Sequence, residues 1–259
     1  MIPRRVFPLA GLLTVVCASA WGQATLPTVI IRDLPTIGVA ATQPTATVSL
    51  SGPYPLNVTV TMKLTFVPAT GSGQPYDAKF ANGSGTTTTF TITPTAPTAS
   101  VPVMIGTVAG IITITTSATD SAGNSLTPVP LTNVMTVNPT VPVITSVIPC
   151  AVTLSGFSIS VTGRSTPRDM TSAGFHFTLP TNTQPSTLDV SVPVSTAFTA
   201  WYNNPNSSAF GSTFKMTVQF SYTGPPGTSV PLVAVTGTLT NSIGSSTPVL
   251  AQSILATCP

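Results

Sequence analysis

The chain contains a single histidine, His176, so a serine-type catalytic triad would have to be built around it. In such a triad the imidazole removes the serine proton and a carboxylate orients the ring, so Asp169 or Asp189 would take the second role. His176 lies in the stretch AGFHFTL, between Phe175 and Phe177. In a strand the two phenylalanines would face the core, which places His176 on the outer face. The sequence therefore predicts an exposed histidine and no triad.

Carboxylates are also too few for the other common hydrolytic and metal chemistries. The chain has no glutamate, and its five acids are scattered: Asp33, Asp77, Asp120, Asp169 and Asp189. Glycoside hydrolysis needs two carboxyl groups flanking a cleft, and calcium sites usually collect several oxygen ligands. Asp120 and Asn124 are better explained by a turn in which Asp120 accepts backbone hydrogen bonds and Gly123 has a positive φ. We predict no catalytic residue, no cofactor and no metal site.

Trp201, Tyr202 and Phe210 make up the densest aromatic stretch, in STAFTAWYNNPNSSAF. One interpretation is a stacking platform for a sugar. The alternative is a short helix that closes one end of a domain, because Phe198, Trp201 and Tyr202 have the i, i+3, i+4 spacing of one helical face and Ser195 could cap it. Exposure of Trp201 and Tyr202 side by side would distinguish the two.

Charged residues make up only 5% of the chain, with eight Lys and Arg against five Asp. Without the two arginines near the N-terminus the net charge is only +1. No basic cluster is present that could neutralise phosphates, which argues against a nucleic-acid partner. The one local charge cluster is GRSTPRD, where we expect Arg164 or Arg168 to form an ion pair with Asp169 that fixes a loop.

Residues 1–22 have the features of a cleaved signal peptide. Two arginines precede the apolar run VFPLAGLLTVVCASA, and ASA or AWG offers a cleavage site at its end. The run is shorter than the roughly 20 residues that span a bilayer. We expect a secreted, extracellular or cell-surface protein with no membrane span in the mature chain. Export leaves Cys150 and Cys258, which most simply form one disulfide.

Period-two alternation predicts strands along most of the chain. The clearest is NVTVTMKLTF, whose apolar residues share one parity: Val58, Val60, Met62, Leu64 and Phe66. Similar runs recur between Gly- and Pro-rich turns at intervals of roughly 8–12 residues, which is typical of β-sandwiches. We therefore predict an all-β chain with two tandem immunoglobulin-like or fibronectin-III-like antiparallel sandwiches. The proline-rich segment VNPTVPVITSVIP separates them, giving domains at residues 23–139 and 140–259.

Several motifs resemble known modules. TSATDSAGNSLTP is similar to bacterial immunoglobulin-like domains, where ATD-x-AGN recurs as a hairpin between late strands. YPLNVTVTMKLTF, KFANGSGTTTTFTI and GTVAGIITITT resemble modules repeated in secreted proteins of acidobacterial type. SGFSISVTGRSTPRDMTSAGFHF and FTAWYNNPNSSAFGSTF resemble a module often found at the C-terminal end of such proteins. The resemblance covers nearly the whole mature chain and implies the sandwich fold, with no catalytic residue to carry over.

These observations lead to a non-enzymatic, secreted structural or adhesive module. Its expected partners are other copies of itself, other extracellular proteins or glycans. Sheet edges rich in Thr and Ser carry few of the charges that block edge-to-edge pairing, which favours self-association. The alternative is a carbohydrate-binding module that uses the region of Trp201, Tyr202 and Phe210.

Overall fold

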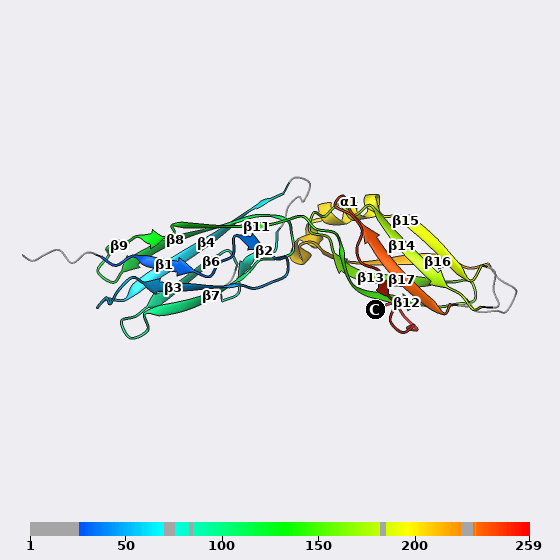
Figure 1. The fold of residues 1–259 in the computed structure, drawn as a ribbon, viewed down its shortest axis with the longest axis horizontal. Helices are drawn as coiled ribbons and strands as arrows, with labels where there is room; N and C mark the ends of the chain where they lie inside the picture. Colours follow the sequence, from blue (N-terminus) through cyan, green and yellow to red (C-terminus); the bar gives the residue numbers. More distant parts are fainter. Residues whose placement is uncertain (1–25, 70–75, 83–84, 182–184, 224–229, 231) are drawn as a thin grey trace, which may run out of the picture.

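The structure is a computed structural model that describes residues 26–69, 76–82, 85–181, 185–223, 230 and 232–259. Its regular elements are strands, apart from the helix α1 (Ser195–Asn203) and the 3-10 helix η1 (Pro205–Phe210). Figure 1 shows four sheets packed as two β-sandwiches, which lie end to end along the long axis of the molecule. The predicted all-β fold of two tandem β-sandwiches is confirmed.

The N-terminal sandwich pairs two sheets whose strands come from both halves of its sequence. The first has the order β10 (Pro128–Val129), β1 (Val29–Arg32), β3 (Thr45–Leu50), β7 (Thr98–Met104), β5 (Lys79–Phe80). The second has the order β2 (Ile37–Gly38), β11 (Thr132–Val137), β8 (Gly110–Asp120), β4 (Val58–Pro68), β6 (Thr87–Ile92), and β9 (Ser125–Leu126) pairs with β8. Paired strands are antiparallel except for β1 with β10 and β2 with β11.

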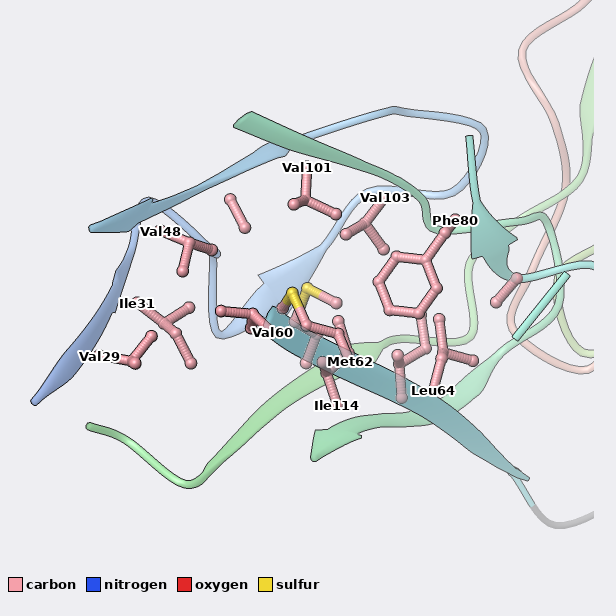
Figure 2. Close-up of a cluster of buried hydrophobic side chains, with 14 of the residues drawn as sticks. Val29, Ile31, Val48, Val60, Met62, Leu64, Phe80, Val101, Val103 and Ile114 are labelled. Atoms are coloured by element: carbon pink, nitrogen blue, oxygen red, sulfur yellow. The ribbon is translucent and has the colours of Figure 1, made fainter. Parts of the chain in front are cut away.

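The alternating sequence of β4 explains how this sandwich forms its core. The apolar residues of one parity are buried, namely Val58, Val60, Met62, Leu64 and Phe66, while the threonines, the lysine and Val67 lie on the outer face. Figure 2 shows Met62 and Ile114 from one sheet facing Val48 and Val103 from the other. Each large apolar side chain buried in this way stabilises the fold by about 1.5–3 kcal/mol.

The C-terminal sandwich pairs a three-stranded sheet with a four-stranded one. The first has the order β12 (Val143–Cys150), β13 (Gly156–Arg164), β16 (Thr213–Ser221). The second has the order β15 (Thr187–Pro193), β14 (Ser172–Thr178), β17 (Ala234–Thr240), β18 (Val249–Leu250). Aromatic rings dominate its core, with centroid separations of 5.2–6.3 Å among Phe157, Phe175, Phe177 and Phe220.

One seam of the second sandwich is closed by the end of the chain. Gln252 donates its backbone N–H to Val147 O at 2.9 Å, and Leu255 donates to Pro149 O at 2.9 Å, so the C-terminal segment pairs with β12. The predicted disulfide between Cys150 and Cys258 is present and ties the segment in place. The opposite seam differs, because β15 and β16 are both edge strands with no further strand beyond them in the described part of the chain.

The helix predicted in the aromatic stretch is present as α1, but its start differs from the expectation. Ser195 is the first helical residue and Val194 precedes it, without a side-chain hydrogen bond to the helix. The side chain of Asn204 instead caps the following η1, accepting a hydrogen bond from the backbone N–H of Asn206 at 2.9 Å. Figure 1 shows α1 at the end of the second sandwich that faces the first.

A buried network of short polar side chains joins the two sandwiches. Thr107, in the loop between β7 and β8, donates its backbone N–H and its hydroxyl to the two carboxylate oxygens of Asp77, at 2.7 and 2.8 Å. From the second sandwich, the N–H of Ser212 donates to Thr107 Oγ1 and the Ser212 hydroxyl donates to Thr107 O, both at 2.7 Å. Both residues are buried, so this contact has little access to competing water.

A second set of hydrogen bonds involves Thr140, in the linker between the two sandwiches. Thr166 accepts from the backbone N–H of Ala109 on its carbonyl and from the N–H of Thr140 on its hydroxyl, both at 2.8 Å. Asn241 then donates its amide to Thr140 O at 2.8 Å. The linker is therefore bonded to the second sandwich, and the second sandwich to the first, at several separate points.

No helix in the described part of the chain is long and apolar enough to cross a membrane. The predicted signal peptide lies outside the described residues.

Candidate binding surface on the second sandwich

Two of the three predicted aromatic site residues lie together on the surface. The rings of Trp201, in α1, and Phe210, in η1, have centroids 5.8 Å apart with an interplanar angle of 37°. Phe210 is 52% exposed, while Trp201 is half-buried. With four residues of the sheet they line a pocket of about 340 Å³, completed by Thr162, Thr213, Phe214 and Lys215.

Tyr202 is the exception, and its predicted place in a sugar platform is wrong. The side chain is only 5% exposed, and its hydroxyl donates to the carbonyl of Ser212 at 2.9 Å. Burial raises the pKa of this phenol. Phe198 and Tyr202 are one turn apart and both face the core, while Trp201 lies at the side of that helical face and is only partly buried. Tyr202 therefore anchors α1 and cannot stack on a ligand.

Arg168 packs against Tyr202 and so helps to hold α1 in place. It is 5% exposed, and its guanidinium lies 4.6 Å from the centre of the Tyr202 ring while donating to Tyr202 O at 2.9 Å. Burial lowers the pKa of this guanidinium. A cation over an aromatic face is stabilised by the ring quadrupole, more strongly where water is excluded. The structure thus places Arg168 against Tyr202 of α1, whereas the sequence predicted that Arg164 or Arg168 forms an ion pair with Asp169.

His176 lies on the outer face of its sheet, as predicted. It faces Asp189 across the β14–β15 pair, with 2.7 Å between Nδ1 and Oδ1, and the two side chains are 47% and 82% exposed. Together with Ser191, Thr236 and other residues they line a shallow groove of about 460 Å³. Among the described residues, no serine hydroxyl is hydrogen-bonded to the imidazole. The pair therefore lacks the bonded nucleophile of a triad.

Asp120 forms the predicted turn. Its carboxylate accepts hydrogen bonds from the backbone N–H groups of Ala122 and Asn124, at 2.9 and 2.8 Å, and Gly123 has φ of 90°. The side chains of Tyr54 and Asn124 donate to its other oxygen. These donors, Tyr54 first, lower the pKa of Asp120 to about 2. Its bonds thus hold the β8–β9 hairpin and tie it to Tyr54, which lies between β3 and β4. No group of three or more potential metal ligands occurs among the described residues.

The comparisons with known proteins assign no family to the chain. No family model matches the chain, and no curated protein matches it in sequence. Among solved structures it is similar to the FN1–FN3 domains of chicken CNTN1, at 12% identity and a TM-score of 0.22, over 88% of this chain and 69% of that one.

Sequence reasoning missed the polar half of the pocket. Strand parity offers a signal for it, because Lys215 alternates with the core residues Phe214 and Met216 and so faces outward beside Thr213. What parity could not supply is the position of Trp201 above this strand. That position depends on the tertiary contact between α1, η1 and the end of the sheet.

Proposed function

We propose that the chain is a non-enzymatic, exported structural or adhesive module made of two domains, residues 23–139 and 140–259. Export through the predicted signal peptide, residues 1–22, would account for the Cys150–Cys258 disulfide, since disulfides persist in oxidising compartments. The resemblance to modules of secreted bacterial proteins supports the same assignment. In this proposal the hydrogen bonds between the two sandwiches hold them end to end as a rod. The rod would keep its binding surfaces at a distance from the surface to which the protein is attached.

The observation that carries the adhesive part of the proposal is the open edge of β16. This strand has nine residues, pairs with β13 on one side only, and contains a single charged residue, Lys215. Unpaired N–H and C=O groups along such an edge can accept another strand, and natural proteins usually protect long edges with charges, prolines or bulges. The inward residues Met216, Val218 and Phe220 are only partly buried, so an added strand would also cover apolar surface.

Sedimentation velocity of the exported, oxidised chain over a wide concentration range tests this proposal. We expect larger species to form as concentration rises, and Thr217→Lys, an outward-facing charge on β16, to suppress them. Thr119→Lys is the matched control, because it adds the same charge at an exposed site on the interior strand β8, opposite the uncharged Thr59 and Ser125. A strictly monomeric chain, or equal effects of the two variants, would contradict adhesion through this edge.

A second candidate function, carbohydrate binding, is favoured by the pocket beside the exposed Phe210 and the half-buried Trp201. Aromatic rings with polar groups beside them suit a sugar, whose ring has an apolar face and hydroxyl groups at its rim. A glycan array probed with the exported chain and with Phe210→Ala tests it. We expect a defined set of oligosaccharides to bind and the variant to lose them, whereas an array with no bound glycan would contradict this candidate.

A further inference from the structure

Two cations lie beside the aromatic pocket on the outer face of the β13–β16 pair. In the register of these strands Thr162 is directly opposite Lys215, and Arg164 is opposite Thr213. All four residues therefore share one face, since directly paired residues do so and side chains alternate along a strand. Arg164 and Lys215 are diagonal neighbours in this arrangement, at a spacing of roughly 7–8 Å.

The charges of these two residues are not balanced by the surrounding protein. Within the described part of the chain, neither side chain has a hydrogen bond or an ion pair. Neither β13 nor β16 contains an acid, and no aspartate lines the pocket. Like charges placed side by side on a sheet repel each other. Two of the six basic residues after position 25 are thus held together where an anion would relieve their repulsion.

We propose that the pocket selects a sugar that carries an anionic group, a carboxylate or a sulfate. This inference rests on the second candidate function, carbohydrate binding. The apolar face of the sugar ring packs against Trp201 and Phe210, and the anionic group lies toward Lys215 and Arg164. The planar fork of an arginine can bind two oxygens of a carboxylate or sulfate at once, and the lysine adds a point charge. Thr162 supplies a hydroxyl for one of the remaining sugar oxygens. The Thr213 hydroxyl donates to Phe210 O, so toward the sugar it serves as an acceptor.

Calorimetric titration of the exported, oxidised chain with matched oligosaccharides tests this proposal. The probes are an oligogalacturonate, its fully methyl-esterified neutral form, and a sulfated galactan oligosaccharide of similar length. We expect at least one acidic probe to bind about fivefold or more tightly than the neutral form, with a preference that shrinks as salt is added. The acidic probe that binds distinguishes carboxylate from sulfate.

The variants Arg164→Gln and Lys215→Gln separate charge recognition from stacking. Each should weaken binding of the preferred acidic probe about two- to fivefold and leave the neutral form within about twofold, as expected for exposed ion pairs. Phe210→Ala should weaken all probes, and Lys63→Gln, an exposed cation on β4, should change none. Equal affinity for acidic and neutral probes, or an acid preference that survives both glutamine variants, would overturn this inference while leaving carbohydrate binding in place. No binding of any probe would overturn both.

Discussion

At the scale of single residues, three charged side chains hold backbone in place. Asp77 and Asp120 each accept hydrogen bonds from backbone N–H groups, and Arg168 donates to a backbone carbonyl. A carboxylate that accepts several such bonds favours its ionised form, which is why the pKa of Asp120 lies well below its ordinary value. These residues therefore shape turns and loops.

Asp120→Asn tests the role of that carboxylate through pH. Because the pKa of Asp120 falls from 3.8 to about 2 on folding, its ionised form stabilises the native state above pH 4, and this contribution is lost as pH falls toward 2. We expect the free energy of unfolding of the wild type, measured by urea denaturation, to drop between pH 4 and 2. The variant should be less stable at pH 7 and lose less over that interval. Asp33→Asn, at an exposed acid, is the control, and an unchanged pH profile in Asp120→Asn would contradict this role.

At the scale of elements, the two seams of the second sandwich differ. The C-terminal segment closes the β12 seam through backbone hydrogen bonds and the disulfide, whereas β15 and β16 leave the opposite seam open. A terminal segment usually frays unless something ties it down. The disulfide supplies that tie and closes a loop with a sequence separation of 108 residues.

Cys150→Ser combined with Cys258→Ser should loosen the closed seam selectively. The entropy of closing a loop of this length corresponds to an upper limit of about 4.7 kcal/mol. We expect hydrogen exchange, followed by mass spectrometry, to become much faster in β12 and the C-terminal segment than in β4, whose sandwich serves as the internal control. Protection that is unchanged in β12, or lost equally in both sandwiches, would contradict this prediction.

Most strands, the β8–β9 hairpin and the helix at α1 could be predicted because their signals are local. β4 alternates in period two, Asp120 and Gly123 have the chemistry of a turn, and Phe198 has helical spacing with Tyr202. The candidate site was predicted only in part. Helical spacing fixes which aromatic residues share a face, but tertiary packing decides how far each one is buried. Tyr202 is therefore buried where the sequence offered it for stacking, and a ligand-binding role of Trp201 and Phe210 stays a prediction.

At the scale of the whole molecule, the junction between the sandwiches could not be predicted from the sequence. It is built from Thr107, Ser212 and Thr166, residue types that occur throughout the chain without any periodic pattern. Gly211 is part of the same contact, because it has φ of 57° and a Cβ there would lie 2.4 Å from the carboxylate carbon of Asp77. Several buried hydrogen bonds across one small contact fix an orientation, since an unmade bond there leaves a desolvated group.

Gly211→Ala tests whether the sandwiches need this close approach. The methyl group would clash with Asp77, and the backbone at φ 57° and ψ −116° lies outside the left-handed α region, so an L-residue is strained there as well. Gly123→Ala is the matched control, with a positive φ and no atom near its Cβ position. We expect Gly211→Ala to lower the melting temperature clearly more than Gly123→Ala. An equal drop in melting temperature for the two variants would contradict this prediction, because the two sandwiches would then tolerate a wider separation at Gly211.

The distance distribution between spin labels on the two sandwiches tests most directly the claim that they act as one rod. Labels at Thr119 and Gln219, exposed sites on β8 and β16, can be attached through non-canonical residues so that the Cys150–Cys258 disulfide stays intact. In dilute solution we predict a single narrow distribution, which broadens when Thr107→Val and Ser212→Ala are introduced together. A broad distribution in the wild type, unchanged by those substitutions, would contradict a rigid junction and with it the proposed structural role.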